Sequence, residues 1–389
     1  MDGERTGSGS VETLLAAKEI LITCGAGGVG KTTVAAALAT MAAVRHGGRV
    51  LVLTIDPARR LADALGLEAF GDKETQVRAE AFREAGVTPR GELWAAMLDT
   101  KQSWDDLVRR HAPNRRTADR ILANKLYDNI TGRFVQSHEY IAMERLYQLH
   151  RDGKYDLIVV DTPPTRNALD FVEAPIRMAE FFSSRFLRIL SAPYRSNVVS
   201  FASRPFLSAA DRILGSQFLE DIAEFFSLFQ TMAPGFVERA EAVNRVLHER
   251  RTTFAVVTTL EAAPVREAEF FIEVLSTKKF HLGAVVLNKV LPSYLLDEKA
   301  ARTAATLDKS ADRVAADSGE EAGDVAQASR VLNEVAESFL RFQVVAQREA
   351  EQRAEMSSGT GAVATVPFFD TDIHDLGGLL RLGEQLWRP

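Results

Sequence analysis

The chain has 389 residues, a formal net charge of −6 and a single cysteine, Cys24. One cysteine excludes an internal disulfide and a cysteine-pair metal site, and the acidic balance excludes a global basic field that would recruit nucleic acid. Residues 1–17 are expected to form a flexible N-terminus rather than a signal peptide, and no run approaches about eighteen apolar residues. We therefore expect a cytoplasmic protein without an integral membrane segment.

The first organised segment is a glycine-rich loop. An apolar run, Ile20–Thr23, precedes Gly25–Thr33, and a helical run from Val34 to Met41 follows. Gly-x-x-x-x-Gly-Lys-Thr between a strand and a helix is typical of a phosphate-binding loop. Its glycines let backbone N–H groups approach the phosphate oxygens, its lysine neutralises phosphate charge and its threonine ligates Mg²⁺. The sequence therefore predicts nucleoside triphosphate binding, through Gly27, Gly28, Val29, Gly30, Lys31, Thr32 and Thr33.

Two further predicted strands end at carboxylates. Residues 49–55 lead into Asp56, and residues 155–160 lead into Asp161. Ligands of open α/β sheets bind beyond the carboxyl ends of the strands, so both side chains are expected beside the nucleotide. Asp161 is interpreted as the carboxylate that holds the Mg²⁺ shell opposite the loop, and a helix-capping aspartate is the alternative.

A third strand, residues 93–98, is followed by a mostly helical stretch over residues 101–150. This stretch contains the basic residues Arg109, Arg110, His111, Arg115, Arg116 and Arg120. A nucleic-acid surface is one interpretation. A solvated helical face is favoured, because the run is short and the protein is acidic.

Residues 168–246 also read as helical, and they hold eleven of the 22 phenylalanines. One predicted helix face comprises Phe218, Ile222, Phe225, Phe226 and Phe229. This face either forms the core of a helical subdomain or lines an apolar groove for another hydrophobic element.

The strand–helix alternation then resumes. The predicted elements are a strand over 253–259, a helix over 263–276 and a strand over 282–287 followed by Asn288. A partly mobile insertion over 296–330 comes next, and then a long amphipathic helix that is marked by Leu332, Val335, Phe339 and Phe342 and broken at 357–361. The chain closes with a strand over 362–366 followed by Pro367, and a helix over 373–387. The pattern predicts an α/β fold: a mostly parallel twisted sheet flanked by helices. We predict one P-loop domain, residues 18–389, with a helical subdomain inserted at about 101–150 and 168–246.

Three motifs, Gly25–Thr33, Thr54–Ala58 and Asp161–Thr165, together resemble the arsenite-pump ATPase family in their order and spacing. That family includes the ATPase of guided entry of tail-anchored membrane proteins, and the resemblance runs from about Lys18 to the C-terminus. It looks closest to the bacterial subgroup of paired, related subunits. The resemblance implies an ATP-hydrolysing, Mg²⁺-dependent dimer whose helical subdomain opens and closes with nucleotide state and handles a hydrophobic protein client. It also favours the groove interpretation, in which exchange of Phe225 and Phe229 for Ser spares stability.

The resemblance also implies roles for individual residues. Lys31 and Thr32 would bind phosphates and Mg²⁺, Asp56 would position the attacking water, and Asp161 would reach Mg²⁺ through water. Asn288 matches the family's adenine-reading asparagine, and Pro367 lies near its base-flanking loop.

The sequence departs from the family at three places. The family's signature lysine, which reaches across the dimer to the partner's phosphates, is Ala26 here, and a Gly-His pair is replaced by Arg166 and Asn167. The cysteines that bind zinc or metalloid in family members are absent, so arsenite stimulation is not expected. Arg59, Arg60 or Arg166 could restore the missing charge, with ordinary surface arginines as the alternative.

Two other functions remain open at this point. The chain could be a nucleotide-binding regulatory subunit of a heterodimer whose related partner supplies the signature lysine. The second open function is that of a partitioning-type positioning ATPase, and the Phe-rich insertion argues against it.

Overall fold

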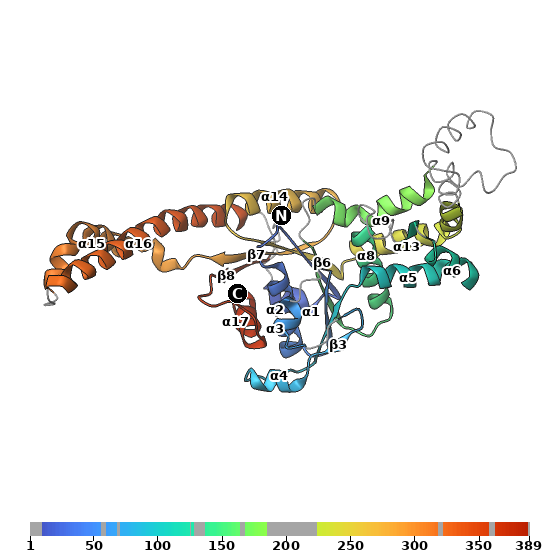
Figure 1. Ribbon diagram of the computed structural model, residues 1–389, viewed down its shortest axis with the longest axis horizontal. Helices are drawn as coiled ribbons and strands as arrows, with labels where there is room; N and C mark the ends of the chain where they lie inside the picture. The colour runs from blue at the N-terminus through green and yellow to red at the C-terminus, as the bar shows by residue number, and fades with distance from the viewer. Residues whose placement is uncertain are drawn as a thin grey trace, which may run out of the picture.

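The architecture is an eight-stranded sheet with helices on both faces and a helical hairpin that extends from one side (Figure 1). The computed structural model describes residues 10–55, 60–67, 71–124, 126–127, 137–163, 168–184, 224–317, 322–357 and 362–387. The strands are β1 Ile20–Cys24, β2 Arg49–Thr54, β3 Thr75–Gln76, β4 Glu92–Met97, β5 Leu157–Asp161, β6 Thr252–Thr258, β7 Leu282–Val290 and β8 Ala362–Pro367.

The sheet has the order β3-β4-β2-β5-β1-β6-β7-β8, and every neighbouring pair is parallel except β3 with β4. The predicted α/β class with a mostly parallel sheet is therefore confirmed. The two-residue strand β3 was not predicted, because it is too short to carry an alternating or continuous apolar pattern.

Successive residues of the central strand β1 enter two separate cores. Ile20 and Ile22 belong to one apolar cluster and Leu21 to the other. A parallel strand that is buried on both faces needs such a continuous apolar run. The helices against one face are α1 Val11–Ala16, α2 Lys31–Arg45, α3 Arg60–Ala64, α4 Ala79–Glu84 and α17 Leu376–Trp387; those of the other core are α5 Thr100–His111, α6 Arg115–Leu122, α8 Ser137–Arg151, α9 Ala168–Ser183, α13 Ala233–His248 and α14 Ala262–Thr277.

We call α5, α6, α8, α9, α13 and residues 224–230 the helical lobe. Phe225 and Phe229 are buried inside it, with ring centroids 5.0 Å apart, and Phe229 also lies 5.2 Å from the Phe182 ring. The groove interpretation is therefore wrong for these two residues, because neighbouring aromatic rings cover them. Phe226 is only half-buried, whereas Phe218 and Ile222 lie outside the described residues.

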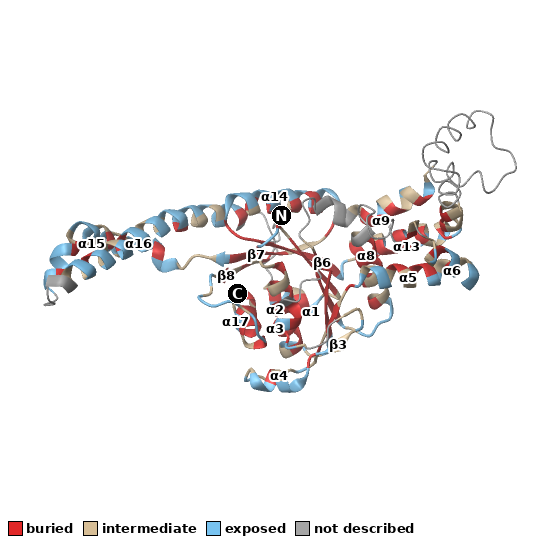
Figure 2. Ribbon diagram, viewed as in Figure 1, coloured by how far each residue is buried: buried red, intermediate tan, exposed pale blue. Residues whose placement is uncertain are grey.

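The stretch over 296–330, which the sequence predicts as a partly mobile insertion, is largely helical. After the short 3₁₀ helix η1 Ser293–Leu296, α15 Glu298–Asp317 packs against α16 Ala322–Ser357 as a hairpin. The hairpin points away from the sheet, and its outer surface is exposed (Figure 2). Alanines such as Ala304, Ala311 and Ala336 fill the interface, so the Ala-rich composition supports close helix packing.

Candidate nucleotide-binding site

The glycine-rich loop connects the end of β1 to the start of α2, as the motif predicts. Gly25 and Gly30 have φ values of +147° and +92°, a region that residues with a Cβ rarely adopt. A Cβ at Gly25 would lie 2.0 Å from the Val257 carbonyl oxygen, and one at Gly30 would lie 2.4 Å from Asn288 Nδ2. Glycine is therefore required at both positions by conformation and by close approach.

Lys31 begins α2 and folds back over the loop. Its side chain is buried, and Nζ donates a hydrogen bond of 2.8 Å to the Ala26 carbonyl oxygen. Thr32 and Thr33 are half-buried in the first turn of α2, where backbone N–H groups have no partner inside the helix. A buried ammonium beside a helix N-terminus and exposed glycines fits a triphosphate and its Mg²⁺.

Asp161 ends β5 beside this loop. Its position in the sheet is level with Thr23 of β1 and with Thr54 of β2. The carboxylate is fully buried, and its Oδ2 accepts a hydrogen bond of 2.9 Å from Thr54 Oγ1. Two strands thus hold an acidic group at the carboxyl edge of the sheet, where the predicted Mg²⁺ shell would lie.

Asn288 and Pro367 lie on neighbouring strands at the same edge. Asn288 is buried and its Nδ2 donates to the Val29 carbonyl oxygen at 2.7 Å, so its amide supports the loop directly. Pro367 pairs with Val290 at the end of β8 and is half-buried. The assignments of both residues to the base remain predictions.

A cavity of about 260 Å³ lies beyond the end of β7, between η1 and α16. Glu349 lines it and accepts a hydrogen bond of 3.0 Å from the Leu291 backbone N–H. Burial raises the pKa of the Glu349 carboxyl group. This contact fixes α16 to the strand that carries Asn288.

Four residues proposed from the sequence cannot be placed in the site. Asp56, Arg59 and Arg166 lie outside the described residues, and Arg60 begins α3 with an undescribed side chain. Their roles as water-positioning carboxylate and replacement cations remain predictions.

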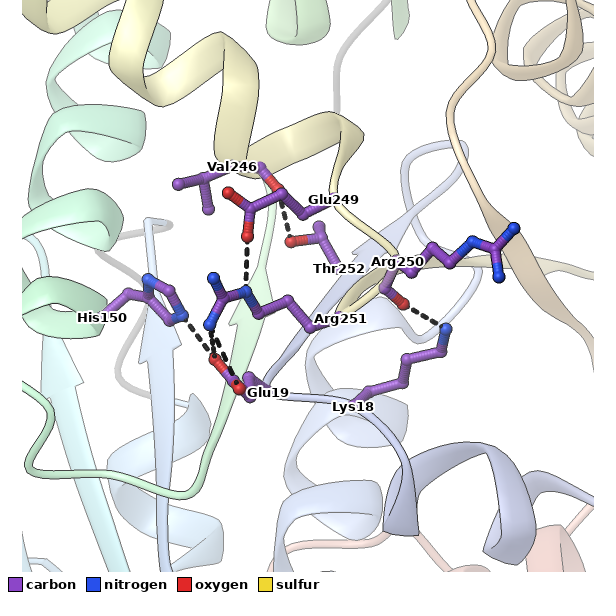
Figure 3. Close-up of polar contacts among 8 residues, drawn as sticks. All are labelled: Lys18, Glu19, His150, Val246, Glu249, Arg250, Arg251 and Thr252. Carbon is purple, nitrogen blue, oxygen red and sulfur yellow. Dashed lines mark hydrogen bonds and ion pairs between the residues drawn. The ribbon is translucent and has the colours of Figure 1, made fainter.

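A charged cluster occupies the opposite edge of the sheet (Figure 3). Glu19, which precedes β1, accepts from Arg251 at 3.1 Å and lies 2.7 Å from His150 Nε2. Burial opposes ionisation of Glu19, but the hydrogen bonds from His150 and Arg251 outweigh it and lower the pKa of this carboxyl group. The cluster ties together the starts of β1 and β6 and the end of α8, far from the carboxyl edge where the loop lies.

The other sequence features have structural explanations. Cys24 is buried, and burial raises the pKa of its thiol, so it packs as a small apolar residue. Arg109, Arg110 and Arg120 of the basic run form ion pairs with acidic side chains of the helical lobe. Among the described residues, no group of His, Cys, Asp and Glu could hold a metal ion, and no helix is long and apolar enough to cross a membrane.

Sequence reasoning missed one residue at the loop, Lys289. Its Nζ donates to the Gly28 carbonyl oxygen at 3.2 Å. Its position directly after Asn288 was the only available signal, and the backbone turn that aims it at the loop has no sequence pattern.

Comparison with known proteins gives a consistent result. The model of the anion-transporting ATPase family matches residues 18–314. The ATPase ASNA1 homolog 1 of Paramecium tetraurelia is 27% identical over 271 residues, which cover 69% of this chain and 73% of that protein. The ATPase get3 of Aspergillus terreus is 26% identical, covering 69% and 72%, and an arsenical pump-driving ATPase of Aquifex aeolicus is 23% identical, covering 70% and 81%.

Proposed function

The chain belongs to the anion-transporting ATPase family, and we propose that ATP hydrolysis at its glycine-rich loop opens and closes the helical lobe. The observation that carries the proposal is how closely the site and the lobe are connected. Asp161 ends β5 only a few residues before α9 begins at Ala168, and Asp99 follows β4 and caps α5. Two strands of the sheet, β4 and the Asp161-bearing β5, are therefore followed within a few residues by helices of the lobe.

The residues present fit the chemistry of an ATPase. Lys31 and Thr32 would hold the phosphates and Mg²⁺, Asp161 would order the waters around the ion, and Asp56 would orient the attacking water. Bound Mg²⁺ would neutralise charge on the phosphates. As water bonds to the γ-phosphorus, the bond between that phosphorus and the bridging oxygen breaks, and ADP leaves with the bridging oxygen. Asn288 and Pro367 would flank the base.

We propose a dimer with a related ATPase subunit and a hydrophobic protein client. The aromatic composition of the lobe supports an apolar client, although Phe225 and Phe229 are buried in this conformation. Cargo binding would therefore use other parts of the lobe, or require it to open. The single cysteine argues against a metalloid effector.

Lys31→Ala tests the proposed site. The exchange should abolish measurable MgATP binding in titration calorimetry, because charge-assisted contacts to phosphate are the strong ones. Asp56→Asn should spare binding and lower turnover, since it removes water positioning rather than a ground-state contact. Unchanged affinity in Lys31→Ala would disprove the loop assignment, and equal losses of binding and turnover in Asp56→Asn would make Asp56 a binding residue.

The second candidate function is a regulatory subunit of a heterodimer, and Ala26 favours it. Ala26 is buried, and its backbone oxygen holds Lys31. No cation can extend from this position to a partner's site. If a partner supplies the missing cation, the isolated chain should hydrolyse ATP slowly, and turnover should rise on adding a lysine-bearing relative. Robust turnover by the isolated chain, lost when Arg59, Arg60 or Arg166 is replaced by Ala, would exclude this candidate.

A further inference from the structure

Strand β7 contains an irregularity next to the glycine-rich loop. Leu287 lies opposite Thr365 of β8 and Val290 lies opposite Pro367, so β7 has one more residue than β8 between these pairs. Lys289 stands in this bulge with φ +58°. Bulges of this kind re-aim side chains and are frequent beside active sites.

The contacts around the bulge maintain its backbone. Asn288 Oδ1 accepts the Lys289 N–H at 3.0 Å, while Asn288 Nδ2 donates to Val29 of the loop. A lysine with positive φ costs of order 1 kcal/mol and persists only where its surroundings enforce it. The same asparagine that supports the loop therefore also holds Lys289 in its unusual conformation.

The bulge directs Lys289 over the rim of the loop. Its ammonium group touches the Gly28 carbonyl oxygen, and Lys31 touches the carbonyl oxygen of Ala26, two residues earlier. A Cβ at Gly28 would have no atom within 4 Å, so the space above this rim is open. Each ammonium has three N–H donors, and the contact with the Gly28 carbonyl oxygen uses one of those of Lys289.

The second lysine with positive φ has a local explanation. Lys279, at φ +62°, follows the C-cap residue Lys278 of α14, and its N–H donates to the Ser276 carbonyl oxygen at the helix end. A left-handed residue at a helix C-terminus is common. Lys289 is at no helix end, and its conformation brings a cation to the loop.

We propose that Lys289 is a second phosphate-binding lysine, whose ammonium contacts the phosphates of bound MgATP together with Lys31. The inference rests on the proposed function, because it requires ATP in the glycine-rich loop. Lys289 would thus supply a cation in the same chain in which Ala26 replaces the family's signature lysine. Because Lys289 is exposed, its attraction for phosphate is screened by salt.

The test compares Lys289→Gln, which removes the charge and keeps most of the length, with Lys289→Arg, which keeps the charge. Lys279→Gln is the matched control, since it also changes an exposed lysine with positive φ. Titration calorimetry at low salt with MgATP, MgADP and adenosine should show about tenfold weaker MgATP binding for Lys289→Gln. The loss should be smaller for MgADP, absent for adenosine and reduced at high salt. Lys289→Arg and Lys279→Gln should stay near the unmodified protein.

The outcomes separate this inference from the proposed function. If Lys289→Gln binds and hydrolyses MgATP like the unmodified protein while Lys31→Ala loses binding, the inference is wrong and the function stands. Equal weakening toward MgATP, MgADP and adenosine, or a nucleotide-free melting temperature lowered well below that of Lys279→Gln, would make Lys289 a support of the loop and overturn the phosphate contact. If the unmodified protein binds no MgATP, both proposals fall.

Discussion

The helical lobe and the α15–α16 hairpin have similar amphipathic helices and opposite burial. In the lobe, Phe225 and Phe229 are almost completely buried in an aromatic cluster with Phe182, Phe236 and Trp104. In the hairpin, Val335 and Phe342 of α16 are 57% and 53% exposed. The lobe packs several helices against each other and the sheet, whereas each hairpin helix has mainly the other as its neighbour.

This difference in burial shows what a second layer of neighbouring elements contributes to covering an apolar helix face. One helix partner covers a single stripe of α16, filled by Ala336 and the half-buried Leu332 and Phe339. A wider apolar face needs a second neighbour, which the lobe has. The ion pairs differ in the same way: Arg239–Glu144 is buried in the lobe, and Arg341–Glu337 is exposed on the hairpin.

The largest effect is expected from the lobe aromatics. Phe225→Ser and Phe229→Ser should each lower the free energy of unfolding by roughly 3–5 kcal/mol, because each leaves a cavity and a buried hydroxyl. Phe342→Ser on α16 should change it by only about 0.5 kcal/mol. Urea unfolding followed by circular dichroism measures all three. A comparable loss for Phe342→Ser would mean that this face of the hairpin is covered in solution.

The ion pairs allow a second, smaller comparison. Glu144 accepts from Arg239 at 2.6 Å, and Arg239 also lies over the Tyr147 ring at 4.3 Å. Glu144→Ala should destabilise the protein by about 3 kcal/mol, because it leaves a guanidinium buried without its carboxylate. Glu337→Ala should cost less than about 0.5 kcal/mol. Equal effects in the same unfolding assay would show that the lobe pair is hydrated.

Acid should weaken the lobe specifically. Burial lowers the pKa of His111 below its usual 6.5, and the nearby Glu144 carboxylate only partly opposes this. The unfolded chain therefore binds a proton at a higher pH than the native state, so stability falls as the pH drops below about 6.5. His111→Gln should flatten this part of the pH profile of the melting temperature. An unchanged slope would assign the acid sensitivity to other groups.

The smallest effect is expected at the kink of α15. Ser310 has a non-helical φ of −135°, and its hydroxyl donates to the Thr306 carbonyl oxygen at 2.7 Å. Ser310→Ala removes this competing bond and improves helix propensity, so the melting temperature should rise slightly, by the equivalent of about 0.5 kcal/mol. A decrease would show that the bend is needed for α15 to pack on α16.

Much of the fold was readable from the sequence because its signals are local. Continuous apolar runs identified seven of the eight strands in the part of the chain that the structure describes. The Gly-x-x-x-x-Gly-Lys-Thr motif identified the loop, because its glycine conformations and lysine belong to one segment. The structure places Asp161 and Asn288 beside that loop, at the sheet edge where parallel strands end.

Tertiary structure alone decided which apolar stripes are buried and where Lys289 points. Phe225 and Phe229 are four residues apart and Val335 and Phe342 are seven apart, and both spacings place a pair on one face of a helix. Only the first pair is buried, since periodicity describes one helix and burial depends on its neighbours. Likewise, the bulge at Lys289 arises from the register between β7 and β8, segments about seventy residues apart. A pattern within one segment cannot encode a contact that forms only when distant segments pack together.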